Sequence, residues 1–235
     1  MAIAFRAVGT AVGTETTTLS LVAPTVSSGD ILFACIVSRN NTAVVAPSAA
    51  WSLIYDTANT TAMQTYLAWK RANSADSGAT FAFTVAGTTS SLGVIIAYSG
   101  VRQDGRPYNG SSISNNASAD NVTFATLSPA GPGMTVAFGT YGEDLTNAAT
   151  FSGTDPTFTE RSDDEFDGTT TDQSIFIWDG PHSGIPTGAR TLASNSTTDA
   201  VNQGILLDLV PMVDGGGARG EAGVLYPRRS RTGDR

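Results

Sequence analysis

The sequence has 235 residues, of which 40% are hydrophobic and 14% charged, so it can furnish the core of one large or two ordinary domains. Its net charge of −8 is unevenly spread. The residues after Met212 hold five arginines against three acidic residues, and the preceding body holds 8 basic and 18 acidic residues. Because an acidic body repels nucleic acid and anionic membranes, we expect neither as a partner.

The composition also favours strands over helices. Thr, Ser, Ala, Gly and Asn take the place of charged residues, and Thr and Val favour strands while Gly, Asn and Asp favour turns. No window repeats Leu, Glu, Lys and Arg with the 3.6-residue period of a helix, so we predict an all-β chain. The first residues do not resemble a signal peptide and no apolar run is long enough for a bilayer, so folding in the cytoplasm is expected.

The first part of the chain predicts a series of strands. Residues 3–23 alternate loosely and suggest two short strands, and the apolar run Ile31–Val37 is typical of a strand buried on both faces. Cys35 lies inside that run, where we interpret it as a small core residue; as the single cysteine it excludes an internal disulfide. Further strands are predicted, in chain order, over Trp51–Tyr55, Gln64–Lys70, Thr80–Val85 and Leu92–Val101.

Residues 102–120 are polar, contain Pro and Gly, and show no periodicity, so we interpret them as a crossing between two modules. Strands are then predicted over Asn121–Leu127, Met134–Tyr141, Phe158–Arg161, Ser174–Trp178, Arg190–Ala193 and Gly204–Val210. Three glycines from Gly215 open a tail whose composition cannot pack a core. The predicted organisation is a module over 1–103, a module over 104–212 and an extended basic arm over 213–235.

Four blocks of sequence recur in the same order. Thr61–Trp69 returns 109 residues later as Thr170–Trp178, Gly78–Thr80 returns as Gly188–Arg190, Gly93–Tyr98 returns as Gly204–Leu209, and Gly29–Ala34 returns as Gly133–Phe138. Blocks in one order with slowly drifting spacing indicate an internal duplication. We therefore predict two similar antiparallel β-sandwich modules, jelly-roll-like in form, followed by the arm.

Residues with catalytic or metal-binding chemistry are few. His182 lies in a loop punctuated by Pro and Gly, and its neighbour Ser183 is too close in sequence to face it as a nucleophile, so a structural histidine is the favoured interpretation. One histidine and one buried cysteine cannot supply the three or four ligands of a zinc site. No phosphate-binding P-loop is present. We predict no cofactor, no catalytic residue and no enzymatic activity.

Two other residue groups carry weaker alternatives. The acidic segment Ser162–Gly168 could place Asp163, Asp164 and Asp167 around Ca²⁺, but its spacing does not fit the helix-flanked calcium loop, so a solvated acidic loop is the simpler interpretation. Its carboxylates could also suggest a glycosidase, although nothing fixes two of them on facing strands. Among the tryptophans, Trp69 and Trp178 fall at matching places in the repeat and are interpreted as core anchors. Trp51 remains the candidate for stacking on a sugar.

Several motifs resemble a known family. They are Gly29-Asp-Ile-Leu-Phe, Trp51-Ser-Leu, Tyr66-Leu-Ala-Trp-Lys-Arg-Ala72, Ile96-Ala-Tyr-Ser-Gly-Val101 and Phe158-Thr-Glu-Arg161. Together they are similar to a family of duplicated β-sandwich proteins found among tailed-bacteriophage virion proteins and bacterial surface proteins. The resemblance covers about residues 17–211 and implies a scaffold without catalytic residues.

The resulting hypothesis is a non-enzymatic virion protein, most simply a capsid decoration (cement) protein that folds in the host cytoplasm. Its partners would be the major capsid protein or other virion subunits, and the resemblance suggests a homo-oligomer, with a trimer as one option. The arm would contact neighbouring subunits through Arg219, Tyr226, Arg228, Arg229, Arg231 and Arg235. The alternative is a glycan-binding module of a tail fibre or adhesin.

Overall fold

The computed structural model describes the chain except for residues 88–89, 144–149, 152–155, 170, 194–199 and 214–235. The described residues form 17 strands and no helix, which confirms the all-β prediction. The strands of the first half are β1 (Ala4–Val8), β2 (Val12–Thr14), β3 (Thr18–Val22), β4 (Ile31–Arg39), β5 (Val44–Val45), β6 (Ser52–Asn59), β7 (Met63–Arg71), β8 (Thr80–Val85) and β9 (Ser91–Ser99). Those of the second half are β10 (Tyr108–Ala119), β11 (Val122–Phe124), β12 (Gly133–Tyr141), β13 (Thr150–Phe151), β14 (Thr159–Asp167), β15 (Asp172–His182), β16 (Arg190–Ala193) and β17 (Ala200–Leu209).

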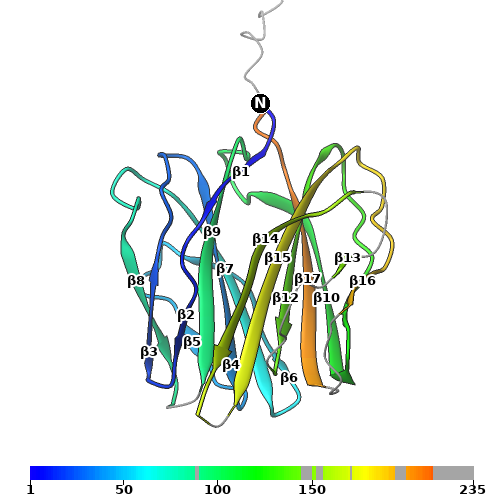
Figure 1. The fold of residues 1–235 in the computed structure, drawn as a ribbon. Coiled ribbons are helices and arrows are strands. Elements are labelled where there is room, and N and C mark those ends of the chain that lie inside the picture. The colour runs from blue at the N-terminus through cyan, green and yellow to red at the C-terminus, as the bar shows by residue number, and fades with distance from the viewer. Residues whose placement is uncertain (88–89, 144–149, 152–155, 170, 194–199, 214–235) are drawn as a thin grey trace, which may run out of the picture.

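The strands build four antiparallel sheets. The first half forms a large sheet in the order β1-β9-β4-β7-β6, with β2 also paired to β9, and a small sheet in the order β3-β8-β5. The second half forms a large sheet in the order β10-β17-β12-β15-β14 and a small sheet in the order β11-β16-β13. The two large sheets lie face to face, and each small sheet covers the outer face of its own large sheet (Figure 1). The molecule is therefore a sandwich of four layers.

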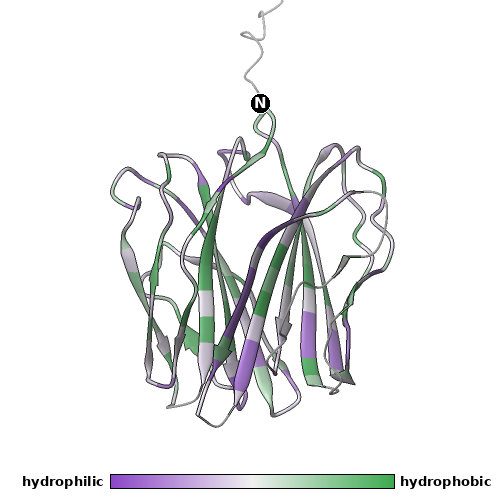
Figure 2. Cartoon of the chain, viewed as in Figure 1, coloured by the Kyte–Doolittle hydropathy of each residue, from purple (hydrophilic) through white to green (hydrophobic). Residues whose placement is uncertain are grey.

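Three apolar clusters hold these layers together. The central cluster draws on both large sheets, and its aromatic contacts cross the interface: the rings of Phe33 and Phe138 lie 5.9 Å apart. The first outer cluster fills the space between the small and large sheets of the first half, around Leu19, Phe83 and Trp51. The second outer cluster does the same in the second half. Because the halves share the central cluster, their large sheets bury apolar side chains on both faces. Figure 2 shows hydrophobic stretches along the middle strands.

The two halves match in strand order and in detail. The two large sheets have the same strand order: β1-β9-β4-β7-β6 in the first half corresponds, strand by strand, to β10-β17-β12-β15-β14 in the second. The small sheets correspond in the same way, with β3-β8-β5 matching β11-β16-β13. Even a bulge recurs: the ladder shifts between Leu53 and Tyr55 in β6 and between Glu160 and Ser162 in β14. Bulges are conserved features of a fold, so this correspondence supports a duplication, which stays a prediction.

The pairing of the strands corrects the repeat alignment by one residue. Trp69 packs against the central cluster, whereas Trp178 packs against the second outer cluster. The two tryptophans thus lie on opposite faces of their sheets, and the prediction that they occupy equivalent positions is wrong. The position that matches Trp69 is Asp179. Trp69 pairs with the first residue of β6 and Asp179 with the first residue of β14, in each case two pairs ahead of the bulge. A slip of one residue exchanges the faces of a strand, and the matching letters of the sequence do not reveal it.

Two segments predicted as loops are strands. The polar crossing 102–120 contains β10, and the acidic segment 162–168 belongs largely to β14. Both lie at an edge of a large sheet, each paired on one side with a central strand. Their side chains lack the apolar alternation that identifies a half-buried strand, because an edge strand leaves many of its side chains in solvent.

The prediction for Cys35 is confirmed, because its side chain is fully buried in the central cluster. Burial raises the pKa of this thiol to about 12, since the low-dielectric interior disfavours the thiolate. A thiol that stays protonated is a poor nucleophile, so Cys35 acts as a small apolar residue.

Candidate functional site

One end of the molecule gathers the described cavities and is called the terminal pole here. It is the end where β4 and β12 begin, where β9, β15 and β17 end, and where Met1 and Met212 lie together. The amino group of Met1 donates a hydrogen bond of 3.1 Å to the carbonyl oxygen of Met212. The described part of the chain therefore both begins and ends at this pole.

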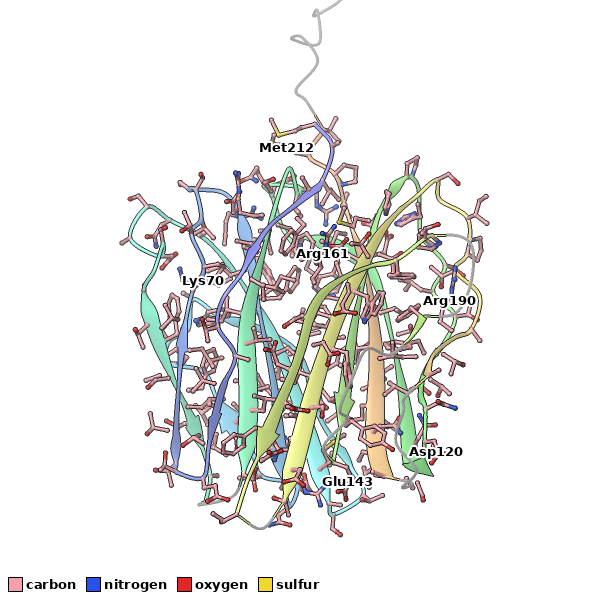
Figure 3. All side chains as sticks on the ribbon, in the orientation of Figure 1. Lys70, Asp120, Glu143, Arg161, Arg190 and Met212 are labelled. Atoms are coloured by element: carbon pink, nitrogen blue, oxygen red, sulfur yellow. The ribbon has the colours of Figure 1, made fainter. Side chains whose placement is uncertain are left out.

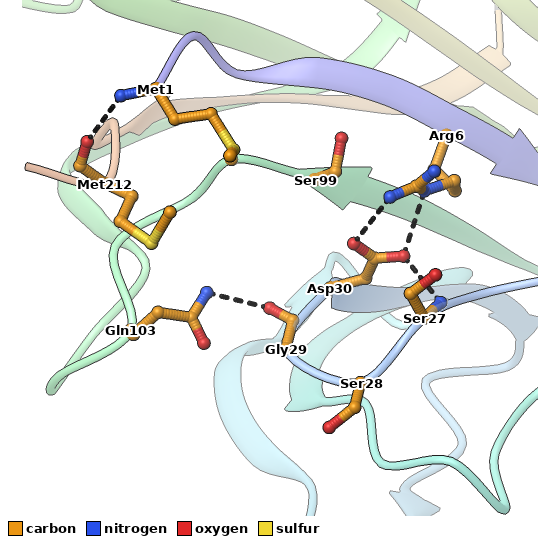
Figure 4. A pocket seen from close by; sticks show the side chains of 10 residues that line it. Met1, Arg6, Ser27, Ser28, Gly29, Asp30, Ser99, Gln103 and Met212 are labelled. Carbon is orange, nitrogen blue, oxygen red and sulfur yellow. Dashed lines mark hydrogen bonds and ion pairs between the residues drawn. The ribbon is translucent and has the colours of Figure 1, made fainter. Parts of the chain in front are cut away.

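The largest described cavity at the terminal pole, about 270 Å³, is lined by polar groups that bind one another. Figure 4 shows Arg6 clamped on Asp30, with Nε–Oδ2 and Nη2–Oδ1 distances of 3.0 and 3.2 Å. The backbone N–H of Ser27 donates to the same carboxylate at 2.8 Å, and Gln103 donates to the carbonyl oxygen of Gly29 at 2.9 Å. These contacts tie the turn before β4 to β1 and to the loop after β9, which is a structural role.

Two smaller hollows, of about 210 and 160 Å³, lie beside each other on the same pole and share Pro132 and Pro211 in their walls. His182 lines one hollow and Asp208 lines the other. The two side chains meet between them, with His182 Nε2 at 2.9 Å from Asp208 Oδ1. Both side chains are buried, so the pair is a wall of the hollows and not an exposed group.

The hydrogen bonds assign the proton of His182. The backbone N–H of Gly184 donates to Nδ1 at 3.2 Å, so Nδ1 is an acceptor and the proton sits on Nε2, which donates to Asp208. A carboxylate-bound imidazole can orient a nucleophile in an enzyme, but here Nδ1 is taken by the backbone. His182 closes β15 and holds the end of β17, which agrees with the structural interpretation from sequence, although as a strand residue and not as a turn residue.

A second buried carboxylate connects the two halves. Arg161 binds Asp179 through two hydrogen bonds of 2.8 and 2.9 Å, and the hydroxyl of Tyr98 donates to the same carboxylate at 3.0 Å. Asp179 is 1% exposed. The hydrogen bonds to Asp179 raise the pKa of Arg161, and burial, together with the charge of Asp179, raises that of Tyr98 well above its usual value. Since Tyr98 lies on β9 and Asp179 on β15, this triad fastens one large sheet to the other.

The opposite end of the molecule is acidic, and we call it the acidic pole. Glu15, Asp120, Glu143, Asp167 and Asp172 lie there, and Figure 3 shows Asp120 and Glu143 far from Met212. The terminal pole instead carries a basic group around Arg71, Arg102 and Arg106, in which Arg71 donates to the carbonyl oxygen of Arg102 at 3.0 Å and Arg102 donates to that of Arg106. Asp104 lies near Arg71 in the same group, so the arginines are partly balanced there, and the charge difference between the two ends rests mainly on the carboxylates of the acidic pole.

The candidate calcium ligands lie on β14, and the structure separates them by face. Asp163 and Asp167 point to one side of the strand and Asp164 to the other, because neighbouring residues alternate. Within the described ranges, no group of three or more His, Cys, Asp or Glu side chains could hold a metal ion. Burial, reinforced by Glu160 and Asp164, raises the pKa of Asp163 to about 6. The expected solvated loop is thus a strand with crowded carboxylates.

Trp51 is not the exposed aromatic residue that glycan stacking requires. It is 6% exposed and packs in the first outer cluster, with its ring in edge contacts of 5.3 Å to Phe81 and 5.4 Å to Phe83. The prediction that this ring is exposed is wrong, because Trp51 lies just before β6 and points at the small sheet. The glycan-binding alternative loses the residue on which it rested.

The predicted arm residues Arg219, Tyr226, Arg228, Arg229, Arg231 and Arg235 lie outside the described residues. The sequence analysis missed the pairs at His182 and Arg161, because their partners are distant in the sequence. Among the described residues there is also no helix that could cross a membrane. No protein-family model, curated protein or solved structure matches the chain.

Proposed function

We propose that the protein is a non-enzymatic structural component of a tailed-bacteriophage virion, a capsid decoration protein that binds the particle through its terminal pole and the segment 213–235. The observation that carries the proposal is the position of Met212. The described body ends at the terminal pole, which holds Arg102 and Arg106, and five arginines follow in the sequence.

The charges of the body support a defined orientation on the particle. An acidic partner surface attracts the terminal pole and its arginine-rich segment and repels the acidic pole, so the body would stand with the acidic pole outward. Arginine pairs well with carboxylates through two parallel hydrogen bonds. The partner chemistry is therefore an acidic face of the major capsid protein or of another virion subunit.

The body itself supports a scaffold role. Three apolar clusters join its layers, and the single histidine and the single cysteine are both buried. The buried ion pair at Asp179 and the buried hydrogen bond between His182 and Asp208 tie strands together. A rigid body with a charged terminal segment fits adhesion to a surface.

The test uses the full chain and particles that lack it. One variant replaces Arg219, Arg228, Arg229, Arg231 and Arg235 by Gln, and its matched control keeps the composition of residues 213–235 but scrambles their order. Co-sedimentation measures the bound protein. The Gln variant is expected to lose at least about tenfold in affinity, since several charge-assisted contacts are removed together. Binding of the Gln variant equal to that of the original chain would refute the proposal, and binding by the scrambled control would show that charge suffices.

A further inference from the structure

The four edges of the two large sheets differ in what protects them from pairing with another chain. The edge strand β14 carries five acidic residues, β6 carries Asp56 and a bulge in its first half, and β1 carries Arg6 and a bulge. The fourth edge strand, β10, spans 12 residues from Tyr108 to Ala119 without any charge. Charged residues and bulges are the usual features that prevent edge strands from pairing with another chain, and β10 has no charged residue.

The middle of β10 is regular and firmly held. Its ladder with β17 runs without a shift from Gly110 to Asn116, between two irregular ends. Ile113 packs against the central cluster. Ser112 donates to the carbonyl oxygen of Ala125 at 3.0 Å, which fixes the strand from the side of the small sheet. The backbone is thus presented in extended form at a fixed place, as strand addition requires.

The side chains around β10 also mark where this edge ends. Asn59 of β6 donates to the carbonyl oxygens of Asn116 and Asn202 at 2.7 and 2.8 Å, at the point where the regular ladder between β10 and β17 ends. Among the described strands, β17 is the one neighbour that pairs with β10. The stretch Gly110–Asn115 is therefore the open part of the edge, and it is centred close to Ile113.

We propose that β10 pairs antiparallel with β10 of a second copy of this chain, about a twofold axis at Ile113, so that the two large sheets of the second halves join into one. A strand without charge can pair with itself without repulsion, whereas the acidic β14 would meet its own charges. A twofold axis makes the interface self-complementary, so one surface serves both subunits.

Charge complementarity selects this register. Arg106 and Asp120 flank β10 and stand seven residues before and seven residues after Ile113. In the antiparallel pair, Arg106 of each copy lies opposite Asp120 of the other, which gives two opposite-charge contacts, one at each end. The same arrangement sets the terminal pole of one copy, with its arginines, beside the acidic pole of the next. The attraction between the poles therefore favours the same register as the contacts between Arg106 and Asp120.

The first measurement is sedimentation equilibrium of the full chain over a range of concentrations. A reversible dimer is expected, and its dissociation constant should rise about tenfold in Arg106→Asp and in Asp120→Arg, since each reversal replaces two attractive contacts by repulsive ones. The double variant Arg106→Asp/Asp120→Arg should restore the dimer to within about threefold, because the swap recreates both contacts. Asp167→Arg, the same change of charge on the opposite edge of the sheet, is the matched control and should leave dimerisation unchanged.

Hydrogen exchange supplies an independent readout. As the concentration rises, amide groups of the stretch Gly110–Asn115 should become protected, while those of β14 should not. A chain that stays monomeric at about millimolar concentration, a double swap that fails to restore the dimer, or protection confined to another edge would each overturn the proposal. A trimer would do so as well. The inference is independent of the proposed virion role, since the experiment requires no particle.

Discussion

The two halves of the molecule share one strand order but differ in charge. Residues 1–103 hold five basic and four acidic residues, for a net charge of +1, whereas residues 104–212 hold three basic and 14 acidic residues, for a net charge of −11. The excess is concentrated on β14, which Figure 2 shows as hydrophilic over much of its length, while the matching strand β6 carries one acidic residue. The common architecture therefore constrains the residues that face the clusters and leaves the edges free to diverge.

The comparison extends to single buried positions. Where the first half has Ile54 and Trp69 at the bulge between two strands, the second half has Arg161 and Asp179. The first pair contributes apolar surface to the central cluster, and the second contributes an ion pair that also binds Tyr98 of the first half. One position thus serves packing in one half and a specific contact between halves in the other.

The largest expected effect comes from breaking that contact. Arg161→Met should lower the free energy of unfolding by about 3–5 kcal/mol, because the buried carboxylate of Asp179 loses its cationic partner. Urea unfolding of the full chain measures this change. Arg6→Met is the matched control, since Arg6 also binds a buried aspartate that keeps a second donor, but that pair is more exposed and lies within the first half. A loss for Arg161→Met no larger than for Arg6→Met would show that the triad does not join the halves.

The pair His182–Asp208 gives a second way to test the comparison. The matching positions of the first half are Ala72 and Ala97, which are buried without any charge. His182→Ala should cost about 3 kcal/mol, because the carboxylate of Asp208 loses the Nε2–H donor while it remains buried. The double variant His182→Ala/Asp208→Ala imitates the first half and should recover at least about 1 kcal/mol of that loss. A double variant less stable than the single one would mean that the pair supports the strand ends by packing alone.

The smallest expected effect lies on β14. Because the pKa of Asp163 is raised to about 6, the folded chain binds a proton that the unfolded chain, with a pKa near 3.8, releases more easily. The carboxylate therefore disfavours the fold above about pH 6 and is neutral in both states below about pH 3.8. Asp163→Asn should stabilise the chain at pH 7 by about 1 kcal/mol, a figure reduced for solvent screening, and the gain should vanish as the pH falls to about 4.

Thermal unfolding at several pH values measures this dependence. Asp167→Asn, an exposed change on the same strand, should remain within about 0.5 kcal/mol of the original chain. A stabilisation by Asp163→Asn that does not change with pH would argue that the carboxylate is not crowded.

Most central strands of this fold could be predicted from sequence, and the edges could not. Apolar runs such as Ile31–Val37 and alternating runs such as Thr80–Val85 appear as β4 and β8, since burial selects their residues directly. β10 lies in the segment predicted as a crossing, and β14 extends the predicted strand Phe158–Arg161 through the segment predicted as an acidic loop. Both were missed because their pairing with a neighbouring strand, and not an apolar pattern of their own, stabilises them. The face-to-face packing of the large sheets also escaped prediction, since sequence periodicity shows that a strand is buried but not what buries it.

The candidate site was less accessible to sequence than the fold. Arg161 and Asp179 stand 18 residues apart and Tyr98 lies 81 residues from Asp179, so no local motif connects them. The match between Ile54 and Arg161, an apolar residue against a charged one, becomes visible only from the strand pairing. For Trp51 the sequence was ambiguous, because a tryptophan beside a strand is equally compatible with packing in a core and with an exposed ring that stacks on a sugar.

The placement of Cys35 gives the molecule an internal reporter. Its thiol lies in the cluster that both large sheets share, so a reagent can reach it only when those sheets separate. In native buffer, the rate of labelling by a thiol-specific dye would therefore follow the opening of the whole sandwich, while fraying of outer strands would leave the signal silent. The native thiol of Cys35 thus allows the rate at which the two large sheets separate to be measured without an engineered probe.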